Sequence, residues 1–252
     1  MNALKVSAWI WTVALALGFP FHAVAVEEQP KKPMPKVEGD MKKSAAPTPT
    51  LIYKPPVRGA PGGRIGGGTR GITQTFMLSA LVPNHTGLTL QEQPVLYWYL
   101  TKPISSPIEF TLTDEGIKPL IEKRLNPPFQ PGIQRVRLGD YGVRLSPGKH
   151  YQWFVALVTD PERRSKDSLA GGTIERIDFP EQLSVKLSRA GKSQAPQIYA
   201  EAGLWYDALA AISDLIDAAP TDTALRSQRA SLLQQGGLTE IAEYDLKPRA
   251  PE

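Results

Sequence analysis

The sequence predicts an α+β protein in which an antiparallel β-sandwich, residues 72–180, is followed by a small helical unit, residues 181–246. Short β-favouring segments, separated by turns that contain Pro and Gly, fill the first range, which is typical of a sandwich. Apolar residues at helical spacing, interrupted by glycine, fill the second range. The chain has 252 residues and is 41% hydrophobic, so it can bury a sizeable core.

The predicted strands are short and bounded by turn signals. Ile108, Phe110 and Leu112 alternate with polar residues, which indicates a strand with one solvated face. The segment 145–160 contains the longest β-favouring apolar run after the N-terminus. Both of its faces are apolar, so we expect a central strand that is covered on both sides. The other predicted strands are 76–82, 94–100, 121–125, 133–138 and 171–179.

The turn before this central strand suggests a specific type of sandwich. Leu145-x-Pro-Gly-x-x-Tyr151 resembles the corner before the sixth strand of fibronectin type III and other immunoglobulin-like domains, where a Tyr hydroxyl bonds to nearby backbone. Trp153 then stands where immunoglobulins place a cysteine, and Trp98 resembles the core Trp of their strand C. We therefore expect an immunoglobulin-like sandwich with these aromatic residues in its core; the alternative is an aromatic platform for sugars or peptides.

The helical unit resembles a tetratricopeptide repeat over part of its length. Tyr199, Gly203, Trp205, Ala208 and Ile212 fall at spacings similar to those of that helix pair. A further helix is expected over 224–235, with a cap in 221–223 and an end at 236–237. One repeat and a half cannot bury its own apolar stripe, so these helices should pack on the sandwich. A short helix over 181–190 is expected to precede them.

The N-terminal residues 1–25 have the layout of a secretory signal peptide. A short positive segment precedes the apolar run Val6 to Gly18, and Ala23-Val24-Ala25 fits the cleavage pattern. An uncleaved membrane anchor is the alternative, but the run is shorter than the ~20 residues of a spanning helix. We expect export to the periplasm or cell envelope, with no stable membrane span after cleavage.

Residues 26–71 are expected to form a disordered linker rich in Pro, Lys and Gly. Its basic residues exceed its acidic ones, so it could lie on an anionic surface; a solvated spacer is the alternative. The Gly-rich part, 58–71, lacks the features of a phosphate-binding loop and indicates a flexible connection or a docking peptide.

The composition excludes several kinds of chemistry. The chain has no cysteine, which excludes disulfides, thiol nucleophiles and thiolate metal sites. The formal net charge is +4, but the excess of basic residues lies in the linker. The folded part is near neutral, so we expect no nucleic-acid partner.

Several motifs together resemble a family of exported cyanobacterial proteins catalogued as domain of unknown function 928. The resemblance covers about residues 58–245 and differs from family members that carry a cysteine near the central strand or after the glycine stretch. It implies export and this architecture but no reaction. The motifs are Arg58-Gly-Ala-Pro, Gly66-Gly-Gly-Thr-Arg-Gly71, Leu78–Pro83, Gly87–Leu90, Pro94–Leu100, Tyr151-Gln-Trp153, Asp160–Ser165, Ile174-Glu-Arg176 and Tyr199–Leu209.

Two groups of residues are candidates for binding. The polar loop after the central strand holds Asp160, Arg163, Arg164 and Asp167, which could form a binding site or an internal network of ion pairs. Tyr97 and Tyr99 could be surface aromatics that hold a polymer. His85 and His150 lie in turns without a triad or a metal-ligand spacing, so no catalytic, metal or cofactor site is predicted.

The leading functional hypothesis is a non-catalytic protein-interaction or scaffold module of the cell envelope, whose partner is an envelope protein. The alternative is a carbohydrate- or peptidoglycan-binding module, in which surface aromatics and the basic tail hold cell-wall polymer. A weaker alternative is an envelope hydrolase. Neighbouring genes or crosslinked envelope partners would discriminate between these classes best.

Overall fold

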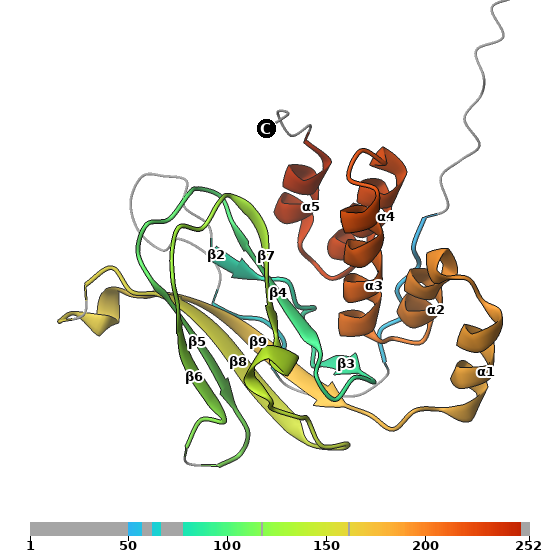
Figure 1. The fold of residues 1–252 in the computed structure, drawn as a ribbon, viewed down its shortest axis with the longest axis horizontal. Helices are drawn as coiled ribbons and strands as arrows, with labels where there is room; N and C mark the ends of the chain where they lie inside the picture. The colour runs from blue at the N-terminus through green and yellow to red at the C-terminus, as the bar shows by residue number, and fades with distance from the viewer. Residues whose placement is uncertain (1–49, 57–61, 67–77, 117, 161, 248–252) are drawn as a thin grey trace, which may run out of the picture. The chain divides into compact units, whose positions relative to one another are not determined.

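The computed structural model describes residues 50–56, 62–66, 78–116, 118–160 and 162–247 (Figure 1). The described residues belong to one compact unit, and the expected signal peptide lies outside them. The strands are β1 (Ile65–Gly66), β2 (Leu78–Ala80), β3 (Gly87–Thr89), β4 (Val95–Leu100), β5 (Ile108–Thr113), β6 (Ile121–Leu125), β7 (Gly132–Arg137), β8 (His150–Leu157) and β9 (Ser168–Arg176). The α-helices are α1 (Glu181–Arg189), α2 (Ala195–Glu201), α3 (Trp205–Ala218), α4 (Thr223–Gln235) and α5 (Thr239–Leu246).

The strands form two sheets, so the predicted α+β class is confirmed. One sheet has the order β1-β9-β8-β5-β6, and the other has the order β2-β4-β7. All pairs are antiparallel except that between β3 and β9. Side chains of both sheets join one hydrophobic core. The sequence did not predict β3, whose three residues are too few to show a period.

Strand β8 is central, as predicted, because it pairs with β5 on one side and β9 on the other. Its side chains at Tyr151, Trp153, Val155 and Leu157 are buried. The expectation that both faces are covered is wrong. The alternate residues from His150 to Ala156 are exposed or half-buried, because only one face of the sheet meets the core.

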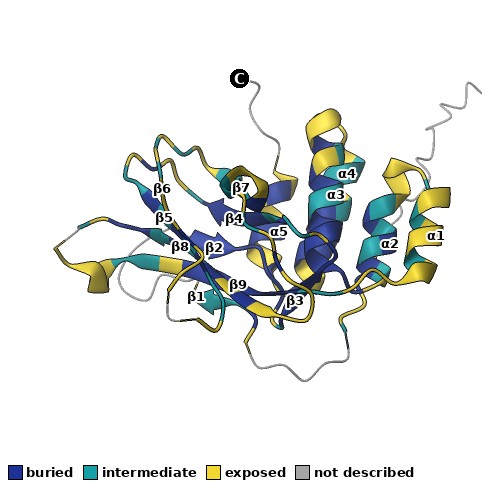
Figure 2. Ribbon diagram, turned by 60° about the horizontal axis from the view of Figure 1, so that its bottom comes forward, coloured by how far each residue is buried: buried dark blue, intermediate teal, exposed yellow. Residues whose placement is uncertain are grey.

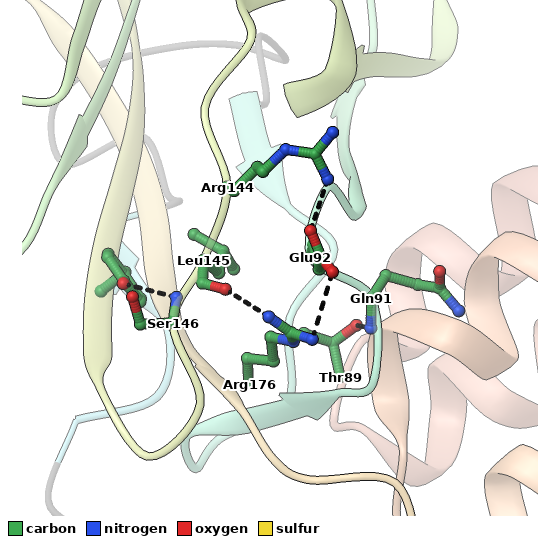
Figure 3. A network of polar contacts seen from close by, with 8 residues as sticks. Thr89, Gln91, Glu92, Arg144, Leu145, Ser146 and Arg176 are labelled. Carbon is green, nitrogen blue, oxygen red and sulfur yellow. Dashed lines mark hydrogen bonds and ion pairs between the residues drawn. The ribbon is translucent and has the colours of Figure 1, made fainter.

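The predicted tyrosine corner is present. The hydroxyl of Tyr151 accepts a hydrogen bond of 2.9 Å from the backbone N–H of Ser146. Arg176, at the end of β9, contacts the same turn: it donates to the carbonyl of Leu145 at 2.8 Å (Figure 3). The Arg176 guanidinium also lies 3.6 Å from the carboxylate of Glu92. These contacts join the end of β9 to the turn before β8 and fix the path of the chain into the central strand.

Helices α2 and α3 form one hairpin, and α4 and α5 form another with a matching turn. Gly203 ends the first helix of one hairpin and Gly237 that of the other, with φ of 76° and 74°. In both turns a leucine N–H reaches back to a carbonyl five residues earlier: Leu204 to Tyr199 and Leu238 to Leu233, both at 2.9 Å. This geometry requires a residue that tolerates positive φ, which is why glycine recurs. The predicted cap is Asp222, which accepts from the N–H of Ala224 at 2.8 Å.

Helix α3 joins the helices to the sheets. Its Trp205 donates to the carbonyl of Leu81 at 2.8 Å. The hydroxyl of Tyr206 accepts from the indole of Trp153 and donates to the carbonyl of Thr173, both at 3.0 Å. All three aromatic side chains are buried, and Figure 2 shows α3 as the most deeply buried helix and α1 as largely exposed. The same core therefore extends through both sheets and α3.

The expectation of disorder is wrong for the described parts of 26–71, which are 50–56 and 62–66. Leu51 and Tyr53 are buried, and β1 pairs with β9. Arg64 donates to the carbonyls of Val82 at 3.0 Å and Gly236 at 2.7 Å. Composition concealed this order because the few apolar residues bury themselves against elements that are distant in the sequence.

Candidate functional site

The polar loop after β8 forms a network of ion pairs. Arg163 lies 2.7 Å from Asp160, and Arg164 lies 2.7 Å from Asp167. Arg164 also makes a two-pronged contact with Glu109 on β5, which lowers the pKa of that carboxyl. The charged groups thus pair with one another and hold the loop against the neighbouring strand, which is one of the two interpretations that the sequence left open.

Tyr97 and Tyr99 do not form a surface platform. They lie on β4, between β2 and β7, and expose only 2% and 5% of their area. The ring of Tyr99 packs against that of Tyr244 on α5 at 5.6 Å between centroids. The expectation of surface aromatics is therefore wrong, because helices cover one face of this sheet. Alternation along the sequence does not show which faces of a strand are covered.

The histidines also have structural surroundings. His85 stacks on Tyr53, and its Nε2 lies 3.1 Å from the Tyr53 hydroxyl. His150 Nε2 lies 3.9 Å from the carboxylate of Glu175. Within the described ranges no cluster of three or more His, Asp or Glu side chains could hold a metal ion.

The most site-like feature is an extended peptide segment bound between helices. Residues 51–54, here called the docked segment, run between α2 and α4. The side-chain carboxamide of Gln235 accepts from the N–H of Tyr53 at 2.8 Å and donates to the carbonyl of Leu51 at 2.6 Å. These two groups flank Ile52, as the partners of one residue do in a parallel ladder. One glutamine therefore takes the place of a residue in a neighbouring strand.

Contacts with α2 satisfy the opposite edge of the docked segment. The carboxamide oxygen of Gln197 accepts from the N–H of Ile52 at 3.3 Å, and the carbonyl of Ala200 accepts from the N–H of Lys54 at 3.0 Å. Successive N–H groups therefore point to opposite sides, as they do in an extended strand. The helical unit recognises the main chain from both edges.

Two side chains of the docked segment enter the core. Leu51 and Tyr53 are 3% and 6% exposed, whereas Ile52 between them is 53% exposed. The ring of Tyr53 lies edge-on to Trp205 at 5.1 Å, and burial raises the pKa of its hydroxyl. The alternation buries every second side chain and leaves the side chain between them, that of Ile52, exposed to solvent.

A cleft of about 610 Å³ continues from the Thr50 end of the docked segment. Its walls come from α1, α2 and α4, and its lining includes Lys186, Arg189, Gln194 and Gln228. Lys186 pairs with Glu201 at 3.0 Å. The pKa of the Glu201 carboxyl is lowered, first by the hydrogen bond from Gln197 and second by Lys186. Arg189 makes no ion pair with any residue that the structure describes.

A second, smaller cavity of about 280 Å³ lies between α3 and the segment before β4. Its notable residue is Asp207, which is 4% exposed. The carboxylate accepts from the backbone N–H of Leu90 at 3.1 Å and from the amide of Gln91 at 3.3 Å. Burial raises the pKa of Asp207 to about 6, although these hydrogen bonds oppose the shift.

The sequence contained one signal for the docked segment that composition obscured. Leu51, Ile52 and Tyr53 are adjacent apolar residues in an otherwise polar and Pro-rich stretch. Such a cluster is typical of short segments that dock on a folded domain. The glutamines that bind the segment could not be recognised, because exposed glutamine is common on helices and nothing in the sequence pairs these residues.

Three comparisons relate the chain to known proteins. A family model described as Domain of Unknown Function (DUF928) matches residues 65–246. A search of curated proteins found no match. Among solved structures, the fn3 domain of human collagen alpha-1(XX) chain is similar over 45% of this chain and 90% of its own, with 11% identity and a TM-score of 0.25. Separately, the described residues include no helix with the length and apolar character to span a membrane.

Proposed function

Because the chain belongs to the Domain of Unknown Function (DUF928) family, whose description assigns no activity, we propose a function from the geometry. The protein is a non-catalytic, exported cell-envelope protein that acts as a protein-interaction or scaffold module. The observation that carries this proposal is the docked segment, whose main chain is held by Gln197 and Gln235. A helical surface that already binds an extended polypeptide is suited to binding another.

The helical unit supports the finer assignment of a tetratricopeptide-like array. The two hairpin turns, at Gly203 and Gly237, are offset by 34 residues, which is the period of that repeat. Ala208 and Ala242 share the same offset and are both fully buried, so each hairpin has a small residue at the same place. The first hairpin rests on the sheets through Trp205 and Tyr206 of α3, and the second contacts β4 through the rings of Tyr244 and Tyr99.

The strand order supports the finer assignment of an immunoglobulin-like sandwich. One sheet orders its strands β9-β8-β5 and the other β2-β4-β7, which matches G-F-C and A-B-E in that fold. In this alignment β8 is the sixth strand, with Tyr151 at its corner. Trp98 then lies on the equivalent of strand B, whereas the sequence comparison suggested strand C.

The proposed location rests on residues 1–25, whose layout is that of a secretory signal peptide. In the native host, fractionation should recover the chain from the periplasm or cell envelope, with an N-terminus at Val26 after cleavage at Ala25. Recovery of the chain with Met1 intact in the soluble cell interior would contradict export.

Site-specific photo-crosslinking in living cells tests the interaction role. A photo-reactive residue at Gln228, in the cleft wall, should give discrete adducts with another protein. The same residue at Glu122, an exposed position on β6, serves as the matched control for random collision. Absence of protein adducts from Gln228, together with sedimentation of the purified chain on cell wall, would replace the proposal with wall binding.

The competing functions have less support. The wall-binding hypothesis depended on the basic tail and on Tyr97 and Tyr99 as surface aromatics, and both tyrosines are buried. The hydrolase hypothesis would need a nucleophile or acid–base pair around His85 or His150. His85 lies between the Tyr53 hydroxyl and the carbonyl of Thr86, and His150 lies beside the carboxylate of Glu175. Wall polymer therefore remains an outcome of the experiments and not a second proposal.

A further inference from the structure

The cleft beyond Thr50 repeats the chemistry that holds the docked segment. On α4, Gln228, Ser231 and Gln235 lie at the spacing of one helix face. Gln235 and Ser231 both contact the carbonyl of Leu51, at 2.6 and 3.4 Å. Gln228 lines the adjoining cleft. The face that binds main chain at one end thus presents the same carboxamide at the other.

The spacing of these glutamines fits an extended chain. Seven residues of α-helix rise about 10 Å, which is the length of about three residues of extended peptide. A polypeptide that continues the direction of the docked segment would therefore meet Gln228 about three residues beyond the point where Gln235 binds. On the opposite wall, Gln194 precedes Gln197 by one helical turn and also lines the cleft.

The charge of the third wall indicates the side chain that such a peptide carries. Lys186 and Arg189 come from α1. Lys186 already forms an ion pair with Glu201, whereas Arg189 has no carboxylate partner among the described residues. A peptide that brings a carboxylate would pair with Arg189, whereas a basic peptide would be repelled.

We propose that this cleft is the binding site for an extended, acidic segment of a partner protein. Gln194 and Gln228 hold the main chain of the segment from opposite edges, and Arg189 pairs with its carboxylate. The proposal rests on the proposed interaction role and adds to it a site and a ligand class. Main-chain recognition makes the site tolerant of sequence, and the arginine sets the preference for acid.

The test uses the purified mature chain and two fluorescent pools of short synthetic peptides, one with a fixed central glutamate and one with a fixed central lysine. The flanking positions are mixtures of Ala, Ser and Thr. Fluorescence anisotropy should show saturable binding of the glutamate pool and at least about tenfold weaker binding of the lysine pool, a ratio equivalent to ~1.4 kcal/mol. Methylation of the peptide nitrogens should abolish binding.

Variants assign any binding to the cleft. Gln194→Ala with Gln228→Ala should weaken the glutamate pool about tenfold or more, and Arg189→Glu should reverse the preference between pools. Gln234→Ala, at an exposed glutamine of α4 that does not line the cleft, and Lys123→Glu on β6 should change neither. A variant counts as folded when its urea midpoint equals that of the parent. If the double variant Gln194→Ala with Gln228→Ala is not folded, Gln228→Glu replaces it.

Several results would overturn the proposal. They are equal binding of both pools, affinity unchanged in the double glutamine variant, or binding of digested cell-wall fragments but of neither pool. Failure of the general role looks different. If cells yield discrete protein adducts from other positions on the helices while Gln228 and the Glu122 control give none, the role stands and the site falls. If the glutamate pool binds as expected but cells yield no protein adduct, the site stands and the role falls.

Discussion

At the scale of single residues, polar groups at a few buried positions decide the geometry. The Tyr151 hydroxyl, the Tyr206 hydroxyl and the Asp207 carboxylate each bond to backbone groups of another segment. A buried donor or acceptor costs free energy when it lacks a partner, so each contact specifies one arrangement of the segments that it joins. These residues therefore determine where the turn, the helix and the sheet meet.

The tyrosine corner predicts the effect of removing one oxygen atom. Tyr151→Phe leaves the N–H of Ser146 without its acceptor and should lower the free energy of unfolding by about 1 kcal/mol. Urea denaturation followed by tryptophan fluorescence measures the difference. Tyr244→Phe, at a tyrosine that is 42% exposed, is the matched control and should leave the midpoint unchanged. Equal midpoints for Tyr151→Phe and the parent would count against the corner.

Asp207 predicts a pH dependence of stability. Burial raises its pKa in the folded state to about 6, from 3.8. The neutral carboxyl is therefore favoured by folding, and the stability that it contributes is lost as the pH rises from about 4 through 6. Asp207→Asn keeps an acceptor but cannot ionise. The variant should gain stability relative to the parent by ~1–3 kcal/mol between pH 4 and pH 7.5.

The comparison is made by urea denaturation across this pH range. If the difference between Asp207→Asn and the parent is constant over this range, the Asp207 carboxyl does not titrate there and the assigned shift is wrong.

At the scale of elements, the helices are held by different kinds of contact. Helix α3 is joined to the sheets by buried aromatic residues. Helices α4 and α5 are joined by the side chains of Arg229 and Asp245, which lie 2.6 Å apart and are 5% and 1% exposed. Helix α1 has no buried residue, so its apolar side chains contribute little to the core and its basic residues face the cleft.

The buried ion pair predicts a non-additive double mutant. Arg229→Leu leaves the Asp245 carboxylate buried without its partner and should cost ~3–5 kcal/mol. The double variant Arg229→Leu with Asp245→Leu should be more stable than either single variant, because it removes both charges together. Thermal unfolding of the four proteins measures the cycle. A double variant with the sum of the two single losses would show that the charges act independently.

At the scale of the whole molecule, the sequence predicted the regular elements better than it predicted their surroundings. Period and turn chemistry located β5, β6, β8 and helices α1 to α4 but not α5, and the corner motif predicted the contact of Tyr151. Burial of Tyr97 and Tyr99 could not be inferred, because alternation along a strand does not show which faces are covered. The order of Leu51 and Tyr53 was missed for a related reason: their partners are helices far along the chain.

The candidate site was predictable only in outline. The repeat-like spacing predicted the helix pair, but the binding of residues 51–54 between α2 and α4 depends on Gln197 and Gln235. These glutamines become recognisable only when the fold brings both within reach of one extended segment. The polar loop around Arg164 was identifiable from its charges, whereas its pairing with Glu109 depends on the pairing of β5 and β8.

Amide hydrogen exchange tests the central claim, the binding of residues 51–54 in the helical groove, most directly. The N–H groups of Ile52 and Tyr53 should be protected against exchange, and Gln235→Ala should reduce protection at Tyr53 while Gln234→Ala leaves it intact. Exchange of both amides at the rate of an unstructured peptide in the parent protein would contradict the docked segment and the cleft that continues from it.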